Sequence, residues 1–150
     1  MLALYIATQE PEISGVLTYA PALKLKISPL NRLKLRLISP FVSVLPKGGE
    51  DDDLPWKGYM VNPLKGVVQL LELQKQVQPR LHLIHQPVLV VQGKLDSTVD
   101  AVVPQMIHDG ISSDVNEIHW MEKSSHCVAL DCELEQVIEI TLRFLSRVKN

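Results

Sequence analysis

Residues 87–96 read PVLVVQGKLD and decide the fold of this 150-residue chain. Residues 87–92 form an apolar run that is typical of a strand buried on both faces of a parallel sheet. Gly93 follows, where it helps the chain to turn off the strand, and an acid, Asp96, stands on the loop that results. Ligands of parallel α/β sheets bind at the carboxyl ends of the strands. Asp96 is therefore a candidate site residue.

A second loop of the same kind carries a histidine. Residues 115–122, VNEIHWME, alternate more strongly and predict a strand nearer the edge of the sheet. The loop after them, Ser124-Ser125-His126-Cys127, contains His126. An acid after one strand and a histidine after the next is the chain order of the last two members of a Ser…Asp…His triad. In such a triad the Asp accepts a hydrogen bond from Nδ1–H of the His. We predict this contact between Asp96 and His126, at about 2.6–3.2 Å.

A simpler interpretation of the same two residues stays open. Asp96 is followed by Ser97 and Thr98, so its carboxylate also suits an Asx-type turn, with His126 as an ordinary surface residue beside it. Taken singly, each residue fits this interpretation. Taken together, in this order and each one turn past a strand, the two residues favour the triad.

The rest of the chain alternates helices and strands. Residues 1–9 are helical in composition, and the apolar, β-branched segment from Ile13 to Ala20 predicts a strand. We expect a single domain over residues 1–150, of the α/β class, with a three-stranded, mostly parallel sheet flanked by helices. Further helices are predicted after Ser28-Pro29, after Asn62-Pro63, from Asp100 to Gly110, and over the stripe Leu130, Leu134, Val137, Ile138, Thr141, Leu142, Leu145 and Val148.

Composition excludes several classes of function. A hydrophobic content of 46% and a charged content of 21% are those of a soluble globular protein, and a net charge of −2 gives no reason to expect nucleic acid as a partner. No apolar run reaches the roughly 18 residues of a transmembrane helix, and no signal peptide is recognisable. Cys127 and Cys132 are too few for a disulfide framework. A reduced, cytoplasmic protein is the expectation.

Other chemically capable residues fit structural roles better. Cys127 adjoins His126 in sequence, but it is better interpreted as a small buried hydrophobe than as a nucleophile. The acidic run from Glu50 to Asp53 lacks the alternation of a calcium loop, and the spare histidines lack metal-ligand spacing, so we expect no metal and no cofactor. The cations of residues 24–47, interleaved with leucines, suit either a lipid interface or an ordinary solvated helix.

Together the motifs resemble a known family. Residues 1–22 and 80–147 are similar to the second half of the carboxylesterases and monoacylglycerol lipases of the α/β-hydrolase fold. In that family the acid stands in a Gly-x-x-Asp stretch like Gly93 to Asp96, and the histidine in a Ser-x-His loop like Ser124 to His126. The resemblance implies a partial α/β-hydrolase fold with a helical lid over approximately residues 23–63. It also implies Asp96 as the triad acid and His126 as the general base.

The nucleophile of that family is missing from this sequence. It stands on a Gly-x-Ser-x-Gly elbow between a strand and a helix, and no such pentapeptide occurs in the chain. The resemblance places the elbow and the oxyanion loop before Met1, because residues 2–7 are similar to the helix that follows the elbow. We therefore expect the C-terminal portion of a serine carboxylic-ester hydrolase, inactive alone, that acts on acyl esters only when the front half is supplied. A non-catalytic self-associating fragment and a module that binds an apolar ligand in the lid groove are the alternatives.

A partner chain is expected for the same reason. In the resembled fold the strand from Ile13 to Ala20 pairs on one side with the nucleophile strand. Without that neighbour it presents unpaired N–H and C=O groups, which are a template for another chain. We expect a homodimer formed through this edge or through exchange of the N-terminal helix.

Overall fold

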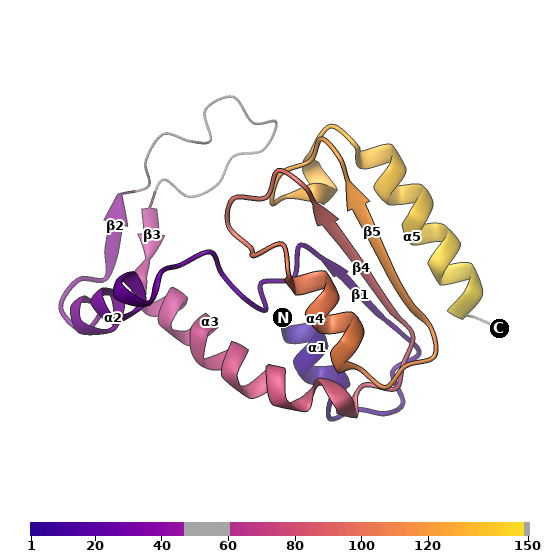
Figure 1. The fold of residues 1–150 in the computed structure, drawn as a ribbon, viewed down its shortest axis with the longest axis horizontal. Coiled ribbons are helices and arrows are strands. Elements are labelled where there is room, and N and C mark those ends of the chain that lie inside the picture. Colours follow the sequence, from indigo (N-terminus) through magenta and orange to yellow (C-terminus); the bar gives the residue numbers. More distant parts are fainter. Residues whose placement is uncertain (47–60, 149–150) are drawn as a thin grey trace.

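The computed structural model describes residues 1–46 and 61–148. Within them the chain alternates helices and strands in the order expected for the α/β class (Figure 1). The elements, in chain order, are α1 (Leu2–Ala7), β1 (Val16–Tyr19), α2 (Pro29–Ile38), β2 (Val44–Pro46), β3 (Val61–Pro63), α3 (Leu64–Val77), the 3-10 helix η1 (Gln78–Leu83), β4 (Val88–Gly93), α4 (Val103–Gly110), β5 (Asn116–Met121), the 3-10 helix η2 (Val128–Leu130) and α5 (Leu134–Val148).

Strand β4 is the centre of a three-stranded parallel sheet with the order β1-β4-β5. Val16 of β1 and Asn116 of β5 both pair with Val88, at the start of β4. All six residues of β4 are buried, since it has a strand on each side and helices on both faces. The predicted central strand and the predicted three-stranded parallel sheet are therefore confirmed.

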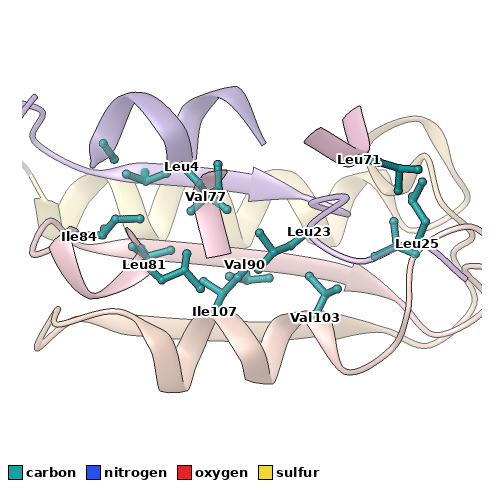
Figure 2. Packing of buried hydrophobic residues seen from close by; sticks show 14 residues of the cluster. Leu4, Leu23, Leu25, Leu71, Val77, Leu81, Ile84, Val90, Val103 and Ile107 are labelled. Atoms are coloured by element: carbon teal, nitrogen blue, oxygen red, sulfur yellow. The ribbon is translucent and has the colours of Figure 1, made fainter. Parts of the chain in front are cut away.

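The alternation of side chains along β4 divides the core into two layers. Val88 and Val90 belong to one layer, and Leu89 and Val91 to the other. Helices α1, α3 and α4 cover the first layer, to which they contribute Leu4, Leu71, Val77, Val103 and Ile107 (Figure 2). Helix α5 covers the second layer with Val137, Ile140 and Phe144. Helices thus pack on both faces of the sheet, and the carboxyl ends of its strands are left to the loops.

Local sequence explains where two of the helices begin. Ser28 caps α2: its Oγ accepts a backbone N–H from the first turn at 3.2 Å, and Pro29 occupies the first helical position, as predicted. Asp100, where the sequence predicts the start of α4, lies before the observed helix. It accepts the N–H of Val102 at 3.1 Å in the preceding turn, and α4 itself begins at Val103.

Helix α5 differs from the stripe expected for it. The helix buries Val137, Ile140 and Phe144, whereas Leu134, Ile138 and Leu142 are 41%, 47% and 62% exposed. The apolar residues of α5 span a wider arc than one face of the sheet can cover. The buried side is therefore offset from the centre of the expected stripe, and an apolar flank stays exposed.

The strands outside β4 and β5 differ from the sequence prediction. Strand β1 (Val16–Tyr19) is shorter than the predicted segment from Ile13 to Ala20. The antiparallel pair of β2 and β3 was not predicted. Both strands of that pair end in proline, Pro46 and Pro63, so their composition resembles an interruption. The acidic run from Glu50 to Asp53 and part of the expected lid lie outside the described residues.

Among the helices described, none combines the length and the apolar character that crossing a bilayer requires.

Candidate active site

Asp96 lies on the loop that follows β4, and its side chain is almost wholly buried (2% exposed). One carboxylate oxygen, Oδ1, accepts hydrogen bonds from the backbone N–H groups of Thr98 (2.7 Å) and Val99 (2.9 Å), which closes a tight turn. The other oxygen, Oδ2, accepts a hydrogen bond from the side-chain amide of Gln92 at 2.7 Å. The turn of the simpler interpretation is therefore present, but it uses only one of the two oxygens.

His126 contacts the second oxygen of the same carboxylate. Its Nδ1 lies 2.9 Å from Asp96 Oδ2, and its side chain is 34% exposed. The contact joins the loops after β4 and β5, which are neighbouring parallel strands. With Nδ1–H donating to Asp96, Nε2 keeps its lone pair and can accept a proton. The two side chains thus lie at the distance expected from the sequence.

The surroundings of Asp96 hold it in its charged form. Burial raises the pKa of this carboxyl, but hydrogen bonds from His126 and from the Val99 and Thr98 N–H groups outweigh burial, so the pKa lies below its ordinary value. Asp96 is therefore an ionised acceptor at neutral pH, able to stabilise a positively charged imidazole. Because the folded-state pKa is lowered, the resulting stability is present above the unfolded pKa and is lost as the pH falls through the folded one.

Gly93 allows the acid loop and the histidine loop to pack backbone against backbone. A Cβ at this position would lie 2.3 Å from the carbonyl oxygens of both Ser124 and Ser125, a distance that no side chain tolerates. The Leu95 N–H donates to the Ser124 carbonyl at 3.1 Å across the same contact. Gly93 also begins the turn off β4, as expected, since its carbonyl oxygen accepts the Asp96 N–H at 3.3 Å. The turn does not itself require glycine, because the φ of Gly93 is not in the left-handed region. Close approach of two backbones is the reason for glycine.

Two residues that the sequence interpretation missed also hold the acid loop. Gln92 is buried near the end of β4, and its amide nitrogen faces Asp96 because two oxygens would repel each other. Its Oε1 is buried and has no hydrogen-bond partner among the described residues. Lys26 donates from Nζ to the backbone oxygen of Asp96. The sequence could have indicated Gln92, because it is the one polar residue in an otherwise apolar run. It could not have indicated Lys26, which lies 70 positions from Asp96 in the chain.

The hydroxyl groups next to His126 in sequence are engaged by acids. Ser124 Oγ donates to Glu133 at 2.6 Å, and Ser125 Oγ donates to Asp131 at 2.6 Å. Both serines therefore bond carboxylates instead of the imidazole. Cys127 is partly buried, less completely than a core hydrophobe would be.

The other histidines do not gather into a second centre. His108 contacts its neighbour Asp109 at 3.2 Å, and His119 contacts Glu117 on the same strand at 3.1 Å. Over residues 1–46 and 61–148, no group of three or more His, Cys, Asp or Glu side chains could hold a metal ion.

Known proteins similar to this chain are ester hydrolases. No family model matches it. A carboxylesterase of Bacillus subtilis (strain 168) is 23% identical over 145 residues, and a thermostable monoacylglycerol lipase of Bacillus sp. (strain H-257) is 25% identical over 146 residues. A solved structure of the metagenome-derived lipolytic enzymes LipS and LipT is 27% identical, covers 97% of this chain and superposes with a TM-score of 0.83. The chain has an α/β-hydrolase fold.

The alignments cover nearly all of this α/β-hydrolase chain but only part of each relative. Each curated relative aligns with 97% of the chain, but the chain spans only 52% of the carboxylesterase and 58% of the monoacylglycerol lipase. The share of the solved lipolytic enzyme is similar, at 60%. The chain thus spans about half the length of the curated relatives it matches. The resemblance to carboxylesterases and monoacylglycerol lipases, and the partial α/β-hydrolase fold that it implied, are confirmed.

We expect Gly93→Ala to lower the free energy of unfolding by about 1–3 kcal/mol, the usual cost of overpacking. The added methyl group forces the Ser124 and Ser125 carbonyls away, and urea denaturation followed by circular dichroism measures the loss. Gly66→Ala, in the first turn of α3, is the matched control. A methyl group there meets the Pro63 side chain at an ordinary contact distance of 3.5 Å. Alanine at that position should stabilise the helix by about 0.5–1 kcal/mol. Equal stability of Gly93→Ala and the wild type would contradict the close packing of the two loops.

Proposed function

We propose that this chain supplies the acid and the general base of a Ser–His–Asp triad in a carboxylic-ester hydrolase of the esterase or monoacylglycerol lipase type. The observation that carries the proposal is the 2.9 Å contact between Asp96 Oδ2 and His126 Nδ1 at the carboxyl ends of two neighbouring parallel strands. The names of the two curated relatives support the same class of substrate.

In the proposed mechanism His126 transfers a proton and Asp96 orients it. Nε2 of His126 takes the proton of the attacking serine and later gives it to the leaving alcohol. Asp96 stays ionised throughout, holds the ring in the tautomer with hydrogen on Nδ1, and stabilises the imidazolium that forms. Its Oδ1 is already occupied by two backbone N–H groups, so only Oδ2 is directed to the ring.

The nucleophilic serine of the proposed triad lies on polypeptide outside these residues. The chain has no Gly-x-Ser-x-Gly elbow, and the hydroxyl groups of Ser124 and Ser125 donate to acids. A serine bound to a carboxylate of lowered pKa faces a weak base instead of an imidazole, and it lacks the strained turn that presents a nucleophile. The chain alone is therefore expected to be inactive.

We further propose that the helices between β1 and β4 form a cap over the substrate site, with a lid at approximately residues 23–63. Helix α2 has no buried residue and exposes Leu30, Leu33 and Leu37, a surface suited to an acyl chain. Gln74 of α3 donates to the Ala22 carbonyl (2.6 Å) and Gln78 of η1 donates to the Leu23 carbonyl (2.7 Å), which ties both elements to the segment after β1.

An isolated site for an apolar ligand is less well supported. The hollow between α2 and α3 has a volume of about 360 Å³, and five of its eight lining residues are charged or carry an amide: Arg32, Arg36, Gln74, Lys75 and Gln78. Pockets for small molecules are lined predominantly by hydrophobic and aromatic side chains, and none of the described residues that line this hollow is aromatic.

The purified chain should not hydrolyse p-nitrophenyl butyrate above background, and Ser124→Ala, Ser125→Ala and Cys127→Ala should not change this result. Fusing the preceding portion of the Bacillus sp. monoacylglycerol lipase to Met1 should create turnover. In that fusion, His126→Ala and Asp96→Asn should each lower kcat by about 10³-fold or more. Turnover by the chain alone that disappears in one of the three variants would identify a nucleophile here and contradict the proposal. Fusion activity that survives His126→Ala would contradict the assigned base.

Self-association is a second candidate function, favoured by an exposed apolar face. Within the described residues β1 pairs only with β4, so its other edge is open. Beside it α5 exposes Leu134, Ile138 and Leu142, which line an almost wholly apolar hollow together with Tyr19. We propose that a second copy of the chain covers this face, since a twofold arrangement lets one patch bind itself.

Light scattering behind size exclusion at micromolar concentration should give a mass of about twice 16.8 kDa. Leu142→Glu should raise the dimer dissociation constant by about tenfold or more, because it buries a charge in the interface. The matched control is Leu30→Glu on α2, whose side chain is equally exposed (61% against 62%) but lies on another face. A monomer that persists on concentration would refute the dimer, and equal weakening by both variants would refute this face.

A further inference from the structure

The loop that carries His126 is held by two acids, Asp131 and Glu133, that lie just before α5. Glu133 accepts hydrogen bonds from the backbone N–H groups of Glu122 (3.1 Å) and Lys123 (2.8 Å), and from Ser124 Oγ (2.6 Å). Its two oxygens are thus shared among three consecutive residues of the loop. Charge-assisted bonds of this kind are roughly twice as strong as neutral ones.

Asp131 continues the same pattern along the loop. Its Oδ2 accepts hydrogen bonds from both the N–H (2.8 Å) and the hydroxyl (2.6 Å) of Ser125, while Oδ1 accepts the N–H of Cys132 at 2.7 Å. Together, Asp131 and Glu133 form a carboxylate pair that binds every residue from Glu122 to Ser125. The next residue along the chain is His126.

The carboxylate pair is itself anchored to the core. The helix that follows it, α5, packs Val137, Ile140 and Phe144 into the layer that contains Leu89 and Val91 of β4. Ser124, which Glu133 holds, is fully buried, and its carbonyl oxygen accepts the N–H of Leu95 from the acid loop. The pair therefore fixes the histidine loop to β4, the strand that leads into the Asp96 loop.

The charged state of both acids suits this role. Burial raises the pKa of Asp131 and of Glu133, but the hydrogen bonds from Ser125 and Ser124 and from the neighbouring backbone outweigh it. Both pKa values lie below their ordinary values, so both carboxylates are ionised at neutral pH.

We propose that Asp131 and Glu133 are positioning residues for His126: they hold its loop so that Nδ1 meets Asp96 Oδ2. The proposal rests on the proposed function, since it concerns the same Asp96–His126 pair. The carboxylate that contacts the imidazole is that of Asp96. Asp131 and Glu133 act instead through the backbone and the serine hydroxyl groups of residues 122–125.

The test follows the His126 Nδ1 proton by NMR in the 150-residue chain. In the wild type this proton should give a downfield resonance that exchanges slowly with water and is lost in Asp96→Asn. Glu133→Gln and Asp131→Asn replace one acceptor oxygen by a donor, so the loop loses bonds while side-chain volume is kept. Each should speed the exchange of the Nδ1 proton by about tenfold or more, the effect of one lost charge-assisted bond on local opening.

Glu135→Gln is the matched control, because it makes the same change of charge at an exposed position on α5. It should leave the resonance and its exchange unchanged. The far-UV circular dichroism of all variants should match the wild type, which separates positioning from unfolding. If an acid variant fails to fold, Ser125→Ala is decisive, since it removes only one bond of Asp131 and should still speed the exchange by about threefold.

The two proposals fail in different ways. A wild-type resonance that survives Asp131→Asn, Glu133→Gln and Ser125→Ala with unchanged exchange would overturn the positioning role and leave the triad standing. A wild type in which the Nδ1 proton shows no protection, or is unaffected by Asp96→Asn, would overturn the Asp96–His126 pair and the positioning role with it.

Discussion

The structure around the site depends on one buried carboxylate. Asp96 can remain charged inside the protein only because each of its oxygens accepts hydrogen bonds, since an unpaired buried charge is very costly. The donors come from three places: the end of β4 through Gln92, the turn after it through Thr98 and Val99, and the next loop through His126. Satisfying this one group therefore fixes the strand end, the turn and the histidine relative to one another.

The parallel sheet makes that arrangement possible. Strand β4 is buried on both faces and between two neighbours, so its carboxyl end is rigid, and β5 brings the second loop to the same edge. Gly93 lets the two loops approach until their backbones touch, and the segment just before α5 supplies the acids that hold the second loop. Core packing and site geometry are thus coupled through β4 and α5, which is why we assign positioning roles to residues that do not touch the imidazole.

Much of this could be predicted from the sequence, because the decisive signals are local. The apolar run before Gly93 indicates a central strand, Ser28-Pro29 starts a helix, and an acid and a histidine after successive strands must share one edge of a parallel sheet. Features that depend on tertiary contacts could not be predicted, because a single sequence does not show which distant residues meet. Lys26 reaches Asp96 from a distant segment, α5 turns Phe144 instead of Leu142 to the core, and the prolines of β2 and β3 conceal their pairing.

The central claim is that Asp96 fixes the proton of His126 on Nδ1. A long-range ¹H–¹⁵N correlation spectrum of the imidazole at neutral pH tests it most directly, in the wild type and in Asp96→Asn. The wild type should show a protonated Nδ1 and an unprotonated Nε2. In Asp96→Asn the proton should move to Nε2, because an amide can donate to Nδ1. A wild-type ring with its proton on Nε2, or the same mixture of tautomers in both proteins, would contradict the account.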